Sequence, residues 1–173
     1  DDALKSVTQT DQTVQNLRDQ WDLWLDLPTT PQEYIRVDDL EEGILRHITP
    51  AFVEDPVRLL RLARFAARLG RWGFRVAHGT HGLCGRMAAS PDLLALRRER
   101  VWQEMKQALG EEQPWRFFEV LHSCGALSQL IPELHQAMGC GSAHAGRGTV
   151  MNALQRAAAL AADPRMRFAC VMY

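Results

Sequence analysis

Four arginines recur along the stretch EDPVRLLRLARFAARLG, residues 54–70, with no acidic residue between them. They are Arg58, Arg61, Arg64 and Arg68. At 100° per residue of a helix they fall within an arc of about 120°, and mainly leucine, alanine and phenylalanine fill the rest. A guanidinium presents a planar set of donors that matches phosphates and nucleobase edges. This face therefore requires either an acidic neighbour in the fold, such as the acidic first third of the chain, or a bound anion.

The limits of this helix are marked by residues with known preferences. Asp55 offers a side-chain acceptor for the N-cap, and Pro56 suits the first helical position. Gly70 is expected to end the helix. Within it, Arg64 and Arg68 repel each other mildly at a spacing of four residues, so partners must come from elsewhere. We predict a helix over 56–69 with one apolar and one basic face.

Charge is divided unevenly along the 173 residues, although the net charge is only −1. Residues 1–57 hold 13 acidic and 4 basic side chains, whereas residues 58–173 hold 8 acidic and 16 basic ones. Only Lys5 and Lys106 are lysines. An arginine-rich region indicates nucleic acid or nucleotide as partner, although a GC-rich genome also favours arginine over lysine. No apolar stretch reaches the roughly 18 residues of a membrane span, so no membrane partner is expected.

The cysteines and histidines predict no metal site. Four scattered cysteines without a C-x-x-C pair are typical of reduced thiols in a cytoplasmic protein. His78, His81 and Cys84 have metal-like spacing, but they lie among glycines and lack a fourth ligand nearby.

Helical periodicity recurs along most of the chain, so the predicted fold class is all-α. The only candidate strand is EYIRV, residues 33–37, and nothing pairs with it convincingly. In the helix at 99–110, a set of apolar residues is expected to face inward. These are Val101, Trp102, Met105, Ala108 and Leu109. Other helices are predicted at 13–27, 40–47, 114–124, 127–134, 150–162 and 165–173.

Five sequence blocks fall between residues 38 and 135. They are DL-x4-LRH, AFVEDPVRLLRLARFAARL, GFRVA, ERVWQEMKQAL and FFEVLHSCGAL. Together they resemble the middle of bacterial class II CCA-adding tRNA nucleotidyltransferases, a branch that also contains bacterial poly(A) polymerases. The later blocks are more similar to CCA-adding enzymes than to poly(A) polymerases.

The resemblance implies a protein template for the incoming nucleobase. The family's Glu-Asp-x-x-Arg motif stands here as Glu54, Asp55 and Arg58, with the next family arginine at Arg61. A carboxylate accepts from the exocyclic amino group of cytosine or adenine, and a guanidinium donates to the ring acceptor beside it. The implied partners are CTP, ATP and the tRNA acceptor end. The basic residues expected to contact RNA are Arg64, Arg68, Arg97 and Arg100.

The family's catalytic β-sheet head has no counterpart in residues 1–37, which lack its Gly-rich turn and its Asp-x-Asp pair. In the family those carboxylates hold the divalent ions that drive transfer. We therefore assign no catalytic residue here, place Mg in the head of the parent enzyme, and expect this chain alone to be inactive. A separate or excised head is an expected partner. Residues 149–173 also lack the histidine and the His-Asp pair of the metal-dependent domain that follows in many relatives.

The resemblance implies a succession of helical regions. Residues 1–37 stay unassigned, with a helical pattern, and residues 38–110 form a neck-like unit that carries the template helix 56–69. Body-like helices at 111–138, a flexible connector at 139–148 and a truncated helical segment at 149–173 follow. Three alternatives stay open: a poly(A) polymerase portion, a head-less RNA-binding or scaffold relative, and a helical domain whose arginines are satisfied internally.

Overall fold

The computed structural model describes residues 37–139, 147–160 and 163–172. The chain divides into two compact units, residues 1–42 and 43–173. In the first unit the described element is the short helix α2 (Val37–Glu41). The predicted helix at 13–27 lies outside the described residues, as does the candidate strand at 33–37 apart from Val37.

The second unit is built almost entirely from helices, so the predicted helical class is confirmed. Its elements in chain order are β1 (Ile44–Leu45), η2 (Pro50–Glu54), α3 (Val57–Leu69), η3 (Gly70–Trp72), β2 (Arg75–Val76), α4 (His78–Ala88), α5 (Pro91–Leu94), α6 (Arg98–Gly110), α7 (Trp115–Ser123), α8 (Ala126–Leu130), α9 (Pro132–Gly139), α10 (Arg147–Ala159) and α11 (Pro164–Met172). None of the described helices is long and apolar enough to cross a membrane.

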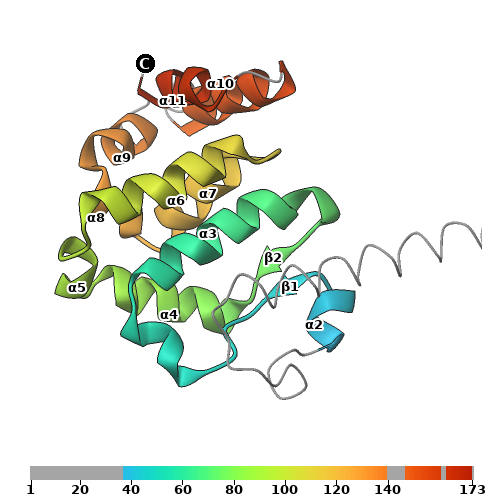
Figure 1. Cartoon of the computed structure of the whole chain (residues 1–173), viewed down its shortest axis with the longest axis vertical. Helices are drawn as coiled ribbons and strands as arrows, with labels where there is room; N and C mark the ends of the chain where they lie inside the picture. Colours follow the sequence, from blue (N-terminus) through green and yellow to red (C-terminus); the bar gives the residue numbers. More distant parts are fainter. Residues whose placement is uncertain (1–36, 140–146, 161–162, 173) are drawn as a thin grey trace, which may run out of the picture. The chain divides into compact units, whose positions relative to one another are not determined.

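Helix α3 lies at the centre of this unit, packed against both α6 and α7 (Figure 1). Ten of its 13 residues are buried, and they include Arg64. The expected two-faced helix is thus buried on most of its circumference, because α6 covers part of the basic face. Since α6 and α7 both contact α3, the boundary expected at residue 110 does not coincide with a gap in the packing.

Two short strands, which the sequence did not predict, pair in parallel. Ile44 pairs with Arg75 and Leu45 with Val76. The helix predicted at 40–47 is therefore wrong: α2 ends at Glu41, and Gly43 follows with a φ of 65°. Glycine adopts this left-handed conformation without the steric cost that a side chain would bring. The chain leaves the helix there and enters β1.

Helix α3 ends at Leu69 with Gly70 at its C-cap, as predicted, but Gly70 does not stop the helix through a left-handed conformation. Gly70 has a helical φ of −57°, and the chain continues into η3 before Gly73 ends the turn at a φ of 83°. Gly70 serves packing instead, since an added Cβ would overlap the side chains of Arg116 and Gln113. The Arg116 guanidinium lies across this point and donates to the carbonyl of Phe74 at 2.9 Å.

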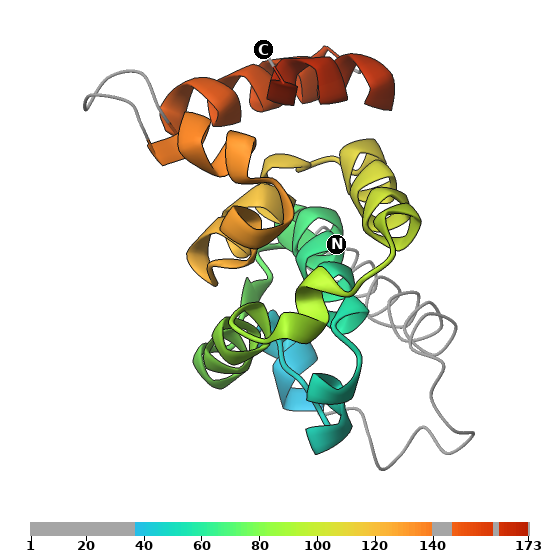
Figure 2. The same cartoon turned by 90° about the vertical axis from the view of Figure 1, so that its left-hand side faces the viewer.

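The C-terminal helices α10 and α11 pack on each other, and α11 also contacts α6 (Figures 1 and 2). The buried Arg167 of α11 donates from Nη1 to the carbonyls of Leu109 and Glu111, at 2.8 and 2.7 Å. It thereby satisfies acceptors left open at the end of α6. The expected inward position of Trp102 is wrong, because its side chain is 41% exposed; its ring meets Phe168 edge-on, with the centroids 5.1 Å apart.

Candidate nucleotide-binding site

The turn that enters α3 holds Asp55 in place. Its Oδ1 accepts from the backbone N–H of Val57 at 3.0 Å, as expected of a capping residue, although the helix begins at Val57. Its Oδ2 lies 3.6 Å from Nη2 of Arg100 on α6. The Asp55 side chain is 37% exposed, so a ligand could still reach its carboxylate. Capping thus occupies one oxygen and leaves the other beside a guanidinium at the surface.

Arg58 lies one turn further along and is fixed separately. Its Nη1 donates to the carbonyl of Ala51 in η2 at 2.7 Å. The backbone N–H of Arg58 donates to the carbonyl of Asp55 at 3.0 Å, which closes the first turn. Within the described part of the chain, the Asp55 carboxylate forms its ion pair with Arg100 rather than with Arg58. The half-buried guanidinium of Arg58 therefore has further N–H donors for a ligand.

His47 anchors the chain just before η2 to α4 and also contacts η2 itself. The backbone N–H and the Nδ1 of His47 both contact the hydroxyl of Thr80 on α4, at 3.0 and 2.9 Å. Thr80 is fully buried, and the rings of His47 and Phe52 lie 5.9 Å apart. Glu54, the last residue of η2, is exposed. The structure therefore brings Glu54, Asp55 and Arg58 together on an anchored turn, and Arg100 joins them.

Arg61 and Arg64 share one acidic partner on α6. Nε of Arg64 lies 2.7 Å from Oε2 of Glu104, and Nε of Arg61 lies 3.4 Å from Oε1. The Arg64 side chain is only 4% exposed, which contradicts the expectation that it contacts RNA. Arg61 is 31% exposed, so part of its guanidinium stays accessible to solvent. The partner lies outside the acidic residues 1–57.

Glu104 is the residue that sequence reasoning missed. It bridges two guanidiniums while its own side chain is 12% exposed. A signal was present, because Glu104 follows Val101 by three residues and precedes Ala108 by four, on the face assigned to the core. A carboxylate on an apolar face requires a buried partner. The sequence could not show which arginines would supply it.

The remaining basic residues of the predicted set are Arg68 and Arg97. Arg68 is half-buried near the end of α3, where its charge, with those of Arg64 and Arg71, opposes the rise that burial causes in the pKa of Glu111. Arg97 is exposed at the start of α6. The structure therefore brings Arg100 to the site, with Arg97 one helical turn before it at the N-cap of α6, and places Arg68 at the other end of α3.

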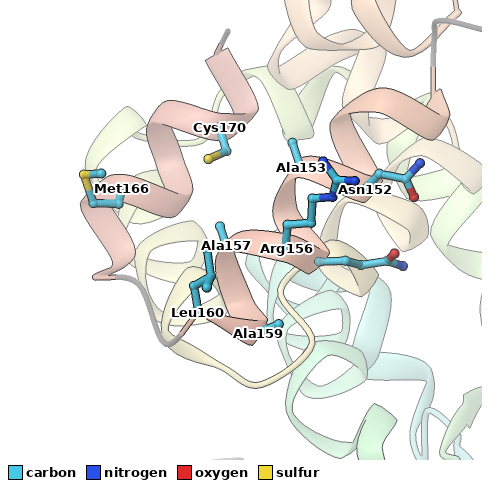
Figure 3. A pocket seen from close by; sticks show the side chains of 9 residues that line it. Asn152, Ala153, Arg156, Ala157, Ala159, Leu160, Met166 and Cys170 are labelled. Atoms are coloured by element: carbon cyan, nitrogen blue, oxygen red, sulfur yellow. The ribbon is translucent and has the colours of Figure 1, made fainter.

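No group of three His, Cys, Asp or Glu side chains that could hold a metal ion occurs within residues 37–139, 147–160 and 163–172. A hollow along α10 and α11 is lined by residues that include Arg156, Leu160, Met166 and Cys170 (Figure 3). All of its lining residues belong to these two helices and their connection, so it is separate from the turn around Asp55.

Comparison with known proteins identifies relatives of this chain. Residues 73–138 match the family described as "Probable RNA and SrmB- binding site of polymerase A". The chain is 50% identical over 142 residues to the multifunctional CCA protein of Thioalkalivibrio sulfidiphilus, which covers 78% of this chain and 34% of that protein. It is 48% identical over 134 residues to the CCA-adding enzyme of Pseudomonas entomophila, covering 78% and 35%. The chain thus spans about a third of the length of these relatives.

Solved structures are also similar to this chain. One is a tRNA nucleotidyltransferase complexed with a primer tRNA and an incoming ATP analog, at a TM-score of 0.52 and 25% identity over 71% of this chain and 34% of that one. Another, a tRNA-processing enzyme with CTP, has the same TM-score and identity, over 71% and 32%. The chain belongs to the superfamily of tRNA nucleotidyltransferases and poly(A) polymerases. Within it, the chain corresponds to a helical part of the CCA-adding enzymes.

Proposed function

We propose that this chain is the part of a CCA-adding tRNA nucleotidyltransferase that selects the incoming nucleotide and binds the tRNA acceptor end. The names of its relatives and the RNA-binding description of the family support this role. The tRNA substrate would place the protein in the cytoplasm.

The observation that carries the proposal is the separate anchoring of Asp55 and Arg58. Asp55 is fixed by the Val57 N–H and Arg58 by the Ala51 carbonyl, so the two side chains do not neutralise each other. Such preorganisation lowers the entropic cost of binding a base. The two groups are one helical turn apart, a spacing at which side chains are neighbours.

Base selection follows from the donors and acceptors of this pair. Cytosine and adenine each carry an exocyclic amino group, which a carboxylate accepts, beside a ring nitrogen, which a guanidinium can donate to. Uracil and guanine present a carbonyl and an N–H at the corresponding positions, so both contacts would be mismatched. Oδ2 of Asp55, which also pairs with Arg100, would accept a hydrogen bond from the amino group. Arg61, which Glu104 orients, would lie beside the bound nucleotide and meet its phosphates.

Transfer would be performed elsewhere in the parent protein. When bound, Mg in a catalytic head activates the primer hydroxyl and stabilises the triphosphate. The described residues contain no group of acids that could take that place. In this proposal the chain alone is inactive, and its residues orient the base and the acceptor end.

Nucleotide addition to a tRNA that lacks its CCA end tests the proposal. The reaction would contain magnesium and this chain, with or without a catalytic head supplied from a CCA-adding enzyme. We expect C and A to be incorporated only when both parts are present. Incorporation by the head alone at the same rate and selectivity, or none with both parts, would contradict the proposal and favour a head-less RNA-binding or scaffold relative.

A poly(A) polymerase portion is the second candidate, because the family description refers to polymerase A. The two candidates differ in their use of CTP. A poly(A) polymerase would accept ATP alone and would extend RNAs other than tRNA, whereas the proposed function requires both nucleotides. Titration of the chain with CTP and with ATP therefore separates them.

A further inference from the structure

An exposed tryptophan lies in the turn between α3 and β2, far from the nucleotide site. Trp72 is 40% exposed, and the guanidinium of Arg71 stacks on its ring, with Cζ 3.7 Å from the centroid. The site around Asp55 lies at the opposite end of α3 (Figure 1). A helix of 13 residues places the two about 20 Å apart.

This turn has a fixed shape. Arg71 also pairs with Glu112, which follows α6. Gly73 ends the turn in the left-handed conformation, with open space around the position of its missing side chain. The carbonyl of Phe74 accepts from Arg116, whose side chain packs on Gly70. The indole is therefore exposed to solvent on a backbone that the contacts of Arg71 and Arg116 fix in place.

The exposed aromatic ring and the basic residues next to it in the chain suit an RNA strand. Glu112 pairs with the guanidinium that stacks on the indole, so the further positive charge must come from Arg75. An aromatic surface together with basic side chains binds nucleobases without strong sequence preference. Arg75, three residues further on, is exposed at the start of β2. The family match described as RNA-binding begins at Gly73, the next residue after Trp72.

We infer that Arg71, Trp72 and Arg75 form a second RNA contact, distinct from the nucleotide site, in which the indole stacks on a base or ribose and Arg75 holds a phosphate. The inference rests on the proposed function, because it takes RNA as the partner. It adds that the bound tRNA is held at both ends of α3. Nucleotide selection at Asp55 and Arg58 does not depend on this contact.

Binding of a labelled CCA-less tRNA to this chain at several salt concentrations tests the inference. Stacking is lost in Trp72→Ala, so we expect affinity to fall roughly five- to hundredfold with the salt dependence unchanged. Trp72→Phe keeps an aromatic surface and should retain part of the affinity. Arg75→Ala should weaken binding and reduce the slope of log K against log salt by about one, as loss of a phosphate contact does.

Arg86→Ala is the matched control, because Arg86 is exposed on α4 and belongs to neither site. Circular dichroism would show that each variant is folded. The inference is overturned if Trp72→Ala binds tRNA like the wild type, or if Arg86→Ala loses as much affinity. The proposed function would survive that result if the variant still bound CTP and ATP. A wild-type chain that bound neither tRNA nor nucleotide would overturn both.

Discussion

Glu104 and Arg64 form a buried ion pair across the interface of α6 and α3, with Oε2 and Nε 2.7 Å apart and the residues 40 positions apart in sequence. Oε1 of the same carboxylate lies 3.4 Å from Arg61. One carboxylate thus forms ion pairs with two of the four arginines on α3. Because Arg61 is partly exposed one helical turn after Arg58, this carboxylate connects the packing of the core to the proposed nucleotide site.

Replacement of Glu104 should destabilise the fold. Glu104→Ala leaves the buried guanidinium of Arg64 without its carboxylate, and breaking a buried pair costs about 3–5 kcal/mol. Glu104→Gln keeps a hydrogen-bond acceptor and should cost less. Urea unfolding measures both, with Glu119→Gln on the exposed face of α7 as the control. A Glu104→Ala variant as stable as that control would show that the pair does not hold α6 on α3.

Arg167 should hold α11 on α6. Arg167→Met removes two hydrogen bonds to the carbonyls of Leu109 and Glu111 while keeping much of the side-chain volume. Hydrogen bonds from a charged group are worth about 1.5–3 kcal/mol each. We expect faster amide exchange throughout α11, measured by mass spectrometry. Arg165→Met, at an exposed position of the same helix, should leave exchange unchanged; equal protection in both variants would contradict the capping role.

Replacing either of two glycines by alanine should change the free energy of unfolding, in opposite directions at the two positions. Gly82 is exposed in the middle of α4 with open space around it, so Gly82→Ala should raise the free energy of unfolding by about 0.5–1 kcal/mol. Gly125 has a φ of 83°, which disfavours a side chain, so Gly125→Ala should lower it by about 1–2 kcal/mol. Thermal unfolding compares the two variants. Changes of the same sign would show that the backbone at one of these positions differs from the structure.

Alkaline pH should weaken the fold through Cys84. Burial, reinforced by the nearby Cys124, raises the pKa of the Cys84 thiol from 9.0 to about 12. As the pH rises above 9.0, the thiol loses its proton in the unfolded chain but keeps it in the folded chain. The free energy of unfolding is therefore highest below that pH and falls progressively towards pH 12. Urea unfolding at about pH 8 and about pH 10 should show a smaller loss in Cys84→Ala than in the wild type. An equal loss in both would contradict the raised pKa.

The long helices of this fold could be predicted because their signals are local. Apolar spacing together with Asp55, Pro114 and Gly110 located α3, α6 and α7 to within about two residues. The glycines of α4, Gly79 and Gly82 among them, weaken its helical pattern. The two short strands could not be predicted from local sequence, because Leu45 pairs with Val76, 31 residues later in the chain.

The candidate site could be predicted only in part, for the same physical reason. The motif that holds Asp55 and Arg58 is local, so the sequence is enough to recognise the resemblance there, and the template role that the resemblance implies stays a prediction. The partners of Arg61 and Arg64, and the approach of Arg100 to Asp55, depend on how α6 packs on α3. A helical wheel treats the basic face as open, whereas α6 covers it at Arg64. Only the tertiary fold separates the buried Arg64 from the arginines whose side chains stay partly accessible to solvent.

The most direct measurement is the nucleotide selectivity of Arg58→Lys. Lysine keeps the charge but loses the planar set of donors that would read the base edge. Calorimetric titration of the chain with CTP, ATP, UTP and GTP, with Arg86→Lys as the control, would give the affinity ratios. If Asp55 and Arg58 form the template, the wild type prefers C and A, and Arg58→Lys reduces that preference by roughly five- to hundredfold. A preference that survives Arg58→Lys unchanged would contradict the template role.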